Sequence, residues 1–371
     1  MHADGVDLLP ALHRLFGGTL PPLSITKLRG DASTRSYYRI ERPLEHIHDA
    51  SARAPRSIIA MRLPEDALAA DELSNAAASA GPAELPFIDV QRMLAARGLP
   101  VPAVLVDDTR GRILLLEDLG DETFEARLLQ QPESEWRARY AEAAVLLARM
   151  HIACEPPRPE ESIAFRRVFD RTLLRGELDH FREWGLEALH GPLAPSDRRA
   201  LDAAFDRVTD RILALPQGFV HRDYQSRNLM WAPRDGADAA LIIIDFQDAL
   251  RGPQAYDLVA LLNDSYVVLD AELQRATVQA YASARGFEAA QTAALAAGFN
   301  LVAVQRKLKD AGRFVFIDRV RGNPSFLPHY PQSLRYAGRA LRATGDGELL
   351  ALLERLVPGF PDTASVPKAV T

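Results

Sequence analysis

The segment GFVHRDYQSRNLMW, residues 218–231, carries the most informative pattern of this 371-residue chain. It places Asp223 directly after His221 and Arg222, and Asn228 follows five residues later, just as an apolar strand begins. A loop with this spacing can direct a carboxylate and a carboxamide into one pocket. The carboxylate would then face a hydroxyl group and the carboxamide a metal ion. Phosphoryl transfer requires groups of these two kinds.

A second segment, IIIDFQDA at residues 242–249, supplies a further carboxylate for such a site. The apolar residues 241–244 predict a buried strand that ends at Asp245, and Phe246 can anchor that end by packing. A carboxylate here can hold Mg²⁺, which neutralises phosphate charge. Each signal alone is weak, because HRD triplets occur by chance and an Asp at a strand end is often a turn residue. Their order and their loop and strand contexts together favour a catalytic site.

A predicted hairpin joins the two stretches, with a first arm at 228–231, a turn at 235–236 and a second arm at 241–245. Around it the chain is helical. One predicted helix begins with Ser134 as its N-cap, and another stops at Pro216. Spacing by four and three places the apolar residues of that second helix on one face. They are Leu201, Phe205, Val208, Ile212 and Leu215.

The first third of the chain instead predicts short strands joined by irregular segments. The predicted strands are 23–28, 36–40, 57–62 and 112–116. They would form a small, mostly antiparallel sheet, and the change to helices falls near residues 117–123. The predicted fold class is therefore α+β, with a small sheet first, a mostly helical remainder, and a catalytic hairpin inserted in the helical part.

The composition restricts the partners of the chain. It has 47% hydrophobic and 25% charged residues and a net charge of -6, which gives no general affinity for nucleic acid or an anionic membrane. Cys154 is the only cysteine, and the first residues lack the basic start and apolar run of a secretion signal. No apolar run approaches the roughly 20 residues that cross a bilayer. We expect a cytoplasmic protein without nucleic-acid or membrane partners, whose oligomeric state the sequence leaves open.

The segments HRDYQSRN and IDFQDA, in this order and at this separation, resemble the catalytic loop and the metal-binding segment of the aminoglycoside phosphotransferase-like kinases, distant relatives of protein kinases. The resemblance implies a two-lobed protein-kinase-like fold that uses ATP and Mg²⁺. It implies a nucleotide-binding lobe at 1–116, a hinge at 117–123 and a catalytic and acceptor-binding lobe at 124–371.

The resemblance also implies roles for the chemical residues. Asp223 becomes the catalytic base or hydroxyl-orienting residue. Asn228 and Asp245 become ligands of Mg²⁺.

Three further residues are implied to support the catalytic loop, namely His221, Arg222 and Asp257. Asp257, in GPQAYDLVALL, matches the buried aspartate that braces this loop in the family. The alternative is that Asp257 only caps a helix.

The segment LRGDASTRSYYRI, between two predicted strands, is a candidate phosphate-binding loop. Gly30 can turn tightly there. The backbone N–H groups of Asp31, Ala32 and Ser33 can then face phosphates. Arg35 can add positive charge. An ordinary hairpin loop with a solvated arginine is the alternative, because the segment has one glycine and not a glycine-rich pattern.

The segment ILLLEDLGDETF predicts a buried strand that runs into a linker. It resembles the hinge between kinase lobes, where backbone groups of Glu117 to Leu119 would bind adenine. A strand followed by a Gly turn is the alternative. The position where sheet changes to helix favours the hinge.

The strand SIIAMRLPED departs from the family pattern, because it lacks the lysine that usually contacts the α and β phosphates. Met61 or Arg62 takes its approximate place, with Asp89 in the position of the partner acid. Arginine and lysine are not equivalent at such sites. The residue that replaces this lysine stays open. A catalytically silent regulatory protein that binds a nucleotide therefore stays an alternative.

The segments GDASTRSYYRI, LLLEDLG, HRDYQSRNLMW and IDFQDALRGPQAYDLVALLND together resemble one branch of the family more closely, the anomeric N-acetylmuramate and N-acetylglucosamine kinases of cell-wall recycling. The similarity runs roughly from Gly30 to Arg306 and implies an amino sugar 1-phosphate made from ATP. An anomeric hydroxyl is more acidic than an ordinary alcohol and needs only modest help from Asp223. An aminoglycoside, a choline-like amine or another alcohol is the alternative acceptor, and GTP could replace ATP.

Asn263, Asp264 and Tyr266 follow the helix that carries Asp257. This place lets them border the acceptor pocket. They could equally do no more than terminate the helix.

An N-acetylmuramate kinase must also accept a lactyl carboxylate, which favours nearby cationic donors. Arg306, Lys307 and Lys309 could supply them, and Arg306 is the candidate acceptor residue among the three. Their spacing along a predicted helix fits a solvated basic face as the alternative.

Overall fold

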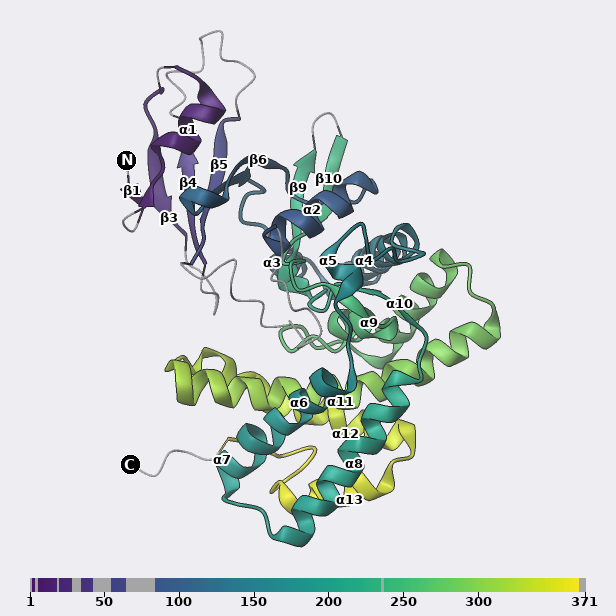
Figure 1. Ribbon diagram of the computed structural model, residues 1–371. Helices are drawn as coiled ribbons and strands as arrows, with labels where there is room; N and C mark the ends of the chain where they lie inside the picture. Colours follow the sequence, from purple (N-terminus) through teal and green to yellow (C-terminus); the bar gives the residue numbers. More distant parts are fainter. Residues whose placement is uncertain are drawn as a thin grey trace. The chain divides into compact units, whose positions relative to one another are not determined.

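The computed structural model is shown in Figure 1. It describes residues 2–3, 6–18, 20–28, 35–42, 55–64, 84–234 and 237–366.

The chain forms two compact units that interleave along the sequence. The first unit contains Met1–Glu122 and Met230–Gln247, and the second contains Thr123–Leu229 and Asp248–Thr371. These units are defined by packing and not by function. The nucleotide-binding lobe expected at 1–116, the hinge at 117–123 and the catalytic lobe at 124–371 therefore stay a proposal.

A five-stranded antiparallel sheet forms the centre of the first unit, in the order β3-β4-β5-β7-β6. Its strands are β3 (Ser24–Lys27), β4 (Ser36–Glu41), β5 (Ser57–Arg62), β6 (Val104–Asp108) and β7 (Ile113–Glu117). The four predicted strands are confirmed, and β6 was not predicted. Alternate residues of the sheet, such as Tyr38, Ile40 and Ile58, pack with Leu12 of helix α1 (Leu9–Phe16) in a buried apolar cluster. A short pair, β1 (His2–Ala3) with β2 (Val6–Asp7), precedes α1.

The predicted hairpin is present in the same unit as β9 (Leu229–Arg234) paired with β10 (Ala237–Ile243). It extends further toward its turn than predicted, and β10 ends two residues before Asp245. The predicted turn residues, Asp235 and Gly236, lie outside the described residues.

Backbone hydrogen bonds fix the hairpin to the rest of the first unit. The N–H of Trp231 donates to the carbonyl of Glu122 (2.7 Å), and that of Ile243 donates to the carbonyl of Pro100 (2.8 Å). Phe246 packs against Phe87 of α2 (Pro86–Ala96) with 5.1 Å between ring centroids, which confirms its predicted packing role.

The second unit is mostly helical. Its helices are α3 (Phe124–Gln130), α4 (Glu133–Ala153), α5 (Ile163–Arg166), α6 (Arg171–His180), the π-helix η3 (Phe181–Glu187), α7 (Ala188–His190), α8 (Pro195–Leu213), α9 (Ala255–Leu262), α10 (Ala271–Ala284), α11 (Ala289–Arg321), α12 (Tyr330–Thr344) and α13 (Gly347–Leu356). Short 3-10 turns occur at η2 (Thr109–Gly111) in the first unit and at η4 (Ser226–Asn228) and η5 (Pro324–His329) in the second. In the part of the chain that the structure describes, no helix is long and apolar enough to cross a membrane.

Two helices were predicted from their sequence patterns. Helix α8 is confirmed: Leu201, Phe205, Val208 and Ile212 are its buried face, and it ends before Pro216. Helix α4 begins two residues earlier than predicted, at Glu133, so the N-cap is Pro132 and not Ser134. Glu133 and Glu135 then lie in the first turn, where negative charge is favourable at a helix N-terminus.

The 33-residue helix α11 runs through the second unit beside α6, α9 and α12 (Figure 1). All eight residues 301–308 are buried, so the helix has no solvent-facing side there. Gly312 permits the close approach to η3, because a Cβ at this position would lie 2.7 Å from the Cα of Phe181. Polar residues in this stretch must therefore find partners inside the protein.

Candidate active site

The HRD segment begins a loop that leaves β8 (Gln217–Val220), which pairs antiparallel with β11 (Leu250–Pro253). We call residues 221–228 the catalytic loop. Asp257, fully buried in the first turn of α9, accepts hydrogen bonds from the backbone N–H groups of His221 (2.7 Å) and Arg222 (2.8 Å). Arg222 has a φ of +81°, a left-handed conformation that costs free energy for a residue with a side chain. Asp257 thus stabilises the strained start of the loop.

Asp257 is itself held by a buried histidine. Nε2 of His151 on α4 lies 3.1 Å from the Asp257 carboxylate, and Nδ1 lies 2.7 Å from the hydroxyl of Tyr281 on α10. The three side chains connect helices α10, α4 and α9 to the start of the loop.

A second buried carboxylate holds the end of the loop. Asp264 accepts hydrogen bonds from the backbone N–H of Ser226 (2.9 Å) and from its hydroxyl. It also accepts one from the backbone N–H of Tyr266 (2.9 Å). Burial raises the pKa of Asp264, although these hydrogen bonds and Lys307 oppose the shift. The loop is therefore tied at both ends to side chains of the same unit.

The neighbours of Asp264 also have identified contacts. Helix α9 ends at Leu262, and the side-chain carbonyl of Asn263 accepts from Nη2 of Arg339 (3.1 Å). The ring of Tyr266 lies under the guanidinium of Arg227, 3.6 Å from ring centroid to Cζ. Arg227 in turn binds Glu125 through two hydrogen bonds (2.7 and 3.1 Å). Their predicted place at the border of an acceptor pocket stays a prediction.

The two chemical residues of the loop lie close together. The side-chain N–H of Asn228 donates to the backbone carbonyl of Asp223 (2.9 Å), which orients the carboxamide. Burial alone would raise the pKa of Asp223, but the cations around it, chiefly Arg306, Lys309 and Arg222, outweigh this and hold the pKa below its ordinary value. Asp223 is therefore a carboxylate at neutral pH.

Arg306 and Lys307 of α11 are buried and Lys309 is largely so, and the interpretation of a solvated basic face was wrong for this stretch. Gln305, Arg306 and Lys307 are exposed by 3% or less, and the side chain of Lys309 by 16%. Arg306 donates to the backbone carbonyl of Arg222 (2.6 Å) and to the Asp223 carboxylate (3.2 Å). Its described contacts are thus with the catalytic loop.

The two lysines meet at one carboxylate. The ammonium of Lys307 donates to Asp310 (2.8 Å) and to the hydroxyl of Ser265 (2.8 Å). The ammonium of Lys309 lies 3.3 Å from the other carboxylate oxygen of Asp310. These cations hold the pKa of Asp310 well below its ordinary value despite its burial.

Glu177 on α6 was not predicted as part of the site. One of its oxygens accepts from Nη2 of Arg222 (2.9 Å) and the other from Nε2 of Gln305 (2.7 Å). The helix buries Leu174, Glu177 and Leu178, which are spaced by three and four. An acidic residue within such an apolar stripe is a signal in the sequence that could have identified it.

Asp245 lies in the first unit, just beyond β10. Its φ is +62°, and its carboxylate accepts a hydrogen bond from Nε2 of Gln247 (2.9 Å). Burial raises the pKa of Tyr37 on β4. The positive charge of Arg35 opposes this shift, and the negative charge of Asp245 adds to it. The side chains of Arg35, Tyr37 and Asp245 are therefore electrostatic neighbours. Because Asp223 belongs to the second unit, its joint use with Asp245 stays a prediction.

The predicted hinge residues 117–122 also belong to the first unit, and Thr123 begins the second. The N–H of Glu117 donates to the carbonyl of Ala103 (2.9 Å), and its carboxylate accepts from the N–H of the same residue (3.0 Å). Arg39 on β4 donates to Asp118 (2.8 and 3.0 Å) and to Asp121 (2.8 and 2.9 Å). This arginine clamps the segment that leaves β7.

The remaining predicted nucleotide residues are placed only in part. Leu119 packs against a small apolar cluster on the hairpin, formed by Met230, Ala232 and Ile242. Arg62 ends β5 opposite Ile113, and its Nε is buried without a hydrogen-bond partner among the described residues. The loop residues predicted to bind phosphates lie outside the described residues, namely Gly30, Asp31, Ala32 and Ser33.

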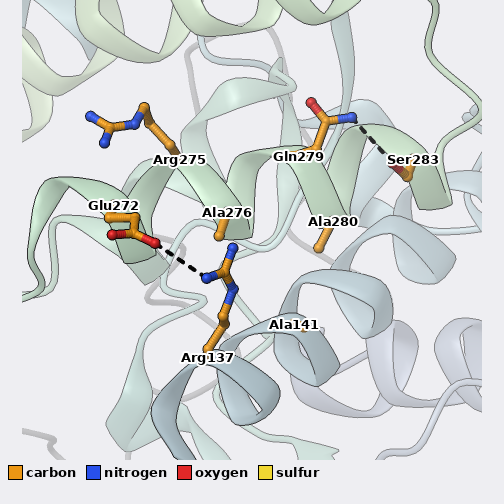
Figure 2. A pocket seen from close by; sticks show the side chains of 8 residues that line it. All are labelled: Arg137, Ala141, Glu272, Arg275, Ala276, Gln279, Ala280 and Ser283. Carbon is orange, nitrogen blue, oxygen red and sulfur yellow. Dashed lines mark hydrogen bonds and ion pairs between the residues drawn. The ribbon is translucent and has the colours of Figure 1, made fainter. Parts of the chain in front are cut away.

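A surface groove of about 600 Å³ lies between α4 and α10 in the second unit (Figure 2). Arg137 and Glu272 pair across it (3.3 Å), and Gln279 contacts Ser283 (3.3 Å). Among the predicted site residues that the structure describes, none lines this groove. It is therefore separate from the catalytic loop.

Comparison with known proteins identifies the class. The sequence matches the phosphotransferase enzyme family (APH) over residues 24–295, and the chain belongs to this family. It is a small-molecule kinase by that membership. Among curated relatives, the N-acetylmuramate/N-acetylglucosamine kinase of Pseudomonas aeruginosa is 29% identical over 93% of each chain. The kinase of the same name from Caulobacter vibrioides is 31% identical, covering 89% of this chain and 91% of the relative.

Solved structures agree on the fold. A microcompartment-associated aminopropanol kinase matches with a TM-score of 0.58 and 17% identity, covering 93% of this chain and all of its own. A choline kinase from Cryptosporidium parvum Iowa II matches with a TM-score of 0.58 and 13% identity, covering 89% and 92%. The predicted α+β, protein-kinase-like fold class is thereby confirmed.

Proposed function

We propose that the chain is an ATP- and Mg²⁺-dependent sugar kinase that phosphorylates the anomeric hydroxyl of N-acetylmuramate or N-acetylglucosamine. The product would be the 1-phosphate, made in the cytoplasm for peptidoglycan recycling. In support, the curated relatives that align along nearly the whole chain are named N-acetylmuramate/N-acetylglucosamine kinase. The observation that carries the proposal is the Asp223 carboxylate, kept ionised in a loop that buried carboxylates hold at both ends.

Asp223 would accept a hydrogen bond from the acceptor hydroxyl and align its oxygen with the γ-phosphate. A carboxylate whose pKa is lowered is a weak base, so its main contribution is orientation, with proton transfer late in the reaction. An anomeric hydroxyl suits such a group, because it is more acidic than an ordinary alcohol.

The residues present fit a magnesium ion. The side-chain N–H of Asn228 donates to the carbonyl of Asp223, and we propose the side-chain oxygen of Asn228 and the carboxylate of Asp245 as the ligand atoms. The described residues hold no cluster of three or more His, Cys, Asp or Glu side chains suited to a metal. Mg²⁺ usually binds one or two protein oxygen ligands, and phosphate oxygens and water molecules complete its coordination shell. The ion would neutralise phosphate charge during transfer.

On the nucleotide side, we propose that Glu117 to Leu119 offer backbone groups to adenine. Leu119 and the apolar hairpin residues beside it provide a suitable surface for a planar base. Gly30 to Ser33 and Arg35 would face the phosphates, with Arg62 in place of the family's lysine. For the acceptor, we propose Asn263, Asp264 and Tyr266 as the border of the pocket.

The deciding experiment is a ³¹P NMR analysis of the protein incubated with ATP, Mg²⁺ and a panel of acceptors. N-acetylmuramate and N-acetylglucosamine should give a sugar 1-phosphate and ADP. Phosphate on an aminoglycoside or on a choline-like alcohol instead would establish the other acceptor classes. Stabilisation by ATP without any turnover would support a silent regulatory protein.

A variant tests the role of Asp223 in the same assay. Asp223→Asn should lower kcat by about 10²–10⁴-fold, the usual contribution of a positioned acid-base group. The control is Asp206→Asn, because Asp206 is an exposed aspartate of α8 in an ion pair with Arg171. Equal activity of the two variants would reject the assigned role.

A further inference from the structure

The guanidinium of Arg306 lies in the interior of the second unit. The residue is 3% exposed, and it sits in the segment of α11 that is buried on all sides. An arginine in such a place is stable only when carbonyl and carboxylate oxygens match its donors. The partners of Arg306 therefore indicate why it is there.

Arg306 donates hydrogen bonds to two consecutive residues of the catalytic loop. Nη1 donates to the backbone carbonyl of Arg222 (2.6 Å), and Nη2 donates to Oδ1 of Asp223 (3.2 Å). The face of the Tyr256 ring lies 4.9 Å from its Cζ, and Asp310 lies 4.0 Å from its Nε, one turn along the helix. The guanidinium plane is thus held from three sides.

The adjacent residues of α11 are engaged elsewhere. Gln305 donates to Glu177, which also binds the side chain of Arg222. Lys307 donates to Ser265 and Asp310. Of these three consecutive residues, Arg306 is the one that donates a hydrogen bond to the Asp223 carboxylate in the described part of the chain.

We propose that Arg306 is a positioning residue for phosphoryl transfer. By engaging Oδ1 of Asp223, it fixes the rotamer of the carboxylate and leaves Oδ2 to align the acceptor hydroxyl. The planar fork of arginine can hold a carbonyl and a carboxylate at once, which a lysine ammonium does with less directional control. This inference rests on the proposed role of Asp223, and it adds a residue distant in sequence that acts through it.

The test compares Arg306→Gln and Arg306→Lys with wild type. Misplacement of a reacting group by about 1 Å can cost about 10²-fold, so Arg306→Gln should lower kcat to this extent with KM for the sugar and for ATP nearly unchanged. Arg306→Lys should recover part of the loss, because it restores the charge without the fork. Arg319→Gln is the matched control, since Arg319 lies on the same helix with its side chain 39% exposed.

A double variant separates positioning from folding. All rates are taken per folded molecule, with the folded fraction measured by circular dichroism at the assay temperature. If Arg306 acts through Asp223, adding Arg306→Gln to Asp223→Asn should cause little further loss. An equal additional loss in both backgrounds, or an Arg306→Gln variant within twofold of wild-type kcat, would overturn the inference. A wild-type protein that phosphorylates no amino sugar would reject the proposed function instead.

Discussion

The catalytic loop in the second unit and the linker after β7 in the first unit are held by different means. Buried carboxylates and a buried arginine from helices α9 and α11, with Asp264 just after α9, hold the loop. The linker is held by backbone hydrogen bonds and by Arg39, which pairs with Asp118 and with the largely exposed Asp121.

The difference has an energetic consequence. Removing one partner of a buried ion pair leaves an uncompensated charge in the interior, whereas an exposed pair contributes little because water and salt screen it. Substitutions around the loop should therefore cost both stability and catalysis. Around the linker, Arg39 has one buried partner, Asp118, and one exposed partner, Asp121, so substitutions there should cost less stability and affect nucleotide binding.

The largest effect is expected for Asp257→Ala. The change leaves the backbone N–H groups of His221 and Arg222 and the ring of His151 without their acceptor. We expect a loss of about 3–5 kcal/mol in the free energy of unfolding, measured by urea denaturation. The exposed Asp206→Ala should change little by comparison. A loss below about 1 kcal/mol for Asp257→Ala would show that the loop does not depend on this carboxylate.

A smaller effect is expected for Glu177→Gln, which keeps the shape but removes the charge opposite Arg222. Hydrogen bonds to charged groups contribute about 1.5–3 kcal/mol, so we expect a loss in that range together with a fall in kcat. Glu348→Gln on α13 is a matched control, because Glu348 pairs with Arg207 at 2.8 Å, close to the 2.9 Å of the buried pair, but is 84% exposed. Equal losses in the two variants would remove burial as the cause of the difference.

Local signals in the sequence were enough to predict the frame of the site. The strands of the sheet, the hairpin and the loop after β8 follow from period-two alternation, turn residues and an acid at a strand end, all within a few residues. Helix α2 could also have been recognised, because Phe87, Val90 and Leu94 are buried at helical spacing.

The buried network could not be predicted in this way. Arg306 and Asp223 are separated by 83 residues, and Gln305 and Glu177 by 128. Polar residues of these types are usually exposed to solvent, and only the enclosure of residues 301–308 of α11 places Gln305 and Arg306 in the interior. Burial of this kind is a tertiary property, which no local pattern of charges carries.

The network also predicts a pH dependence of stability. Burial alone would raise the pKa of Asp310, but Lys307 and Lys309 hold it below its ordinary value. A depressed pKa in the folded state means that Asp310 stabilises the fold above the unfolded pKa of about 3.9, and that this stabilisation is lost as the pH falls below it. The unfolding free energies of wild type and Asp310→Asn should therefore approach each other by about 1–2 kcal/mol between pH 7 and pH 3. A gap that stays constant over this range would contradict the assignment.

The smallest effect is expected for Arg39→Met, which frees Asp118 and Asp121 from their clamp. Asp121 is 77% exposed, and the buried Asp118 keeps a hydrogen bond from the backbone N–H of Gly120 (3.0 Å), so the unfolding free energy should fall by only about 1 kcal/mol. If the linker binds adenine, a looser linker should raise KM for ATP by about 2–5-fold with kcat unchanged. This factor corresponds to a loss of binding free energy of up to about 1 kcal/mol. Arg110→Met, at an exposed site of the same unit, should change neither parameter. An unchanged KM in Arg39→Met would remove the linker from the nucleotide site, whereas a fall in kcat like that of Arg306→Gln would show that the two regions do not divide binding and catalysis between them.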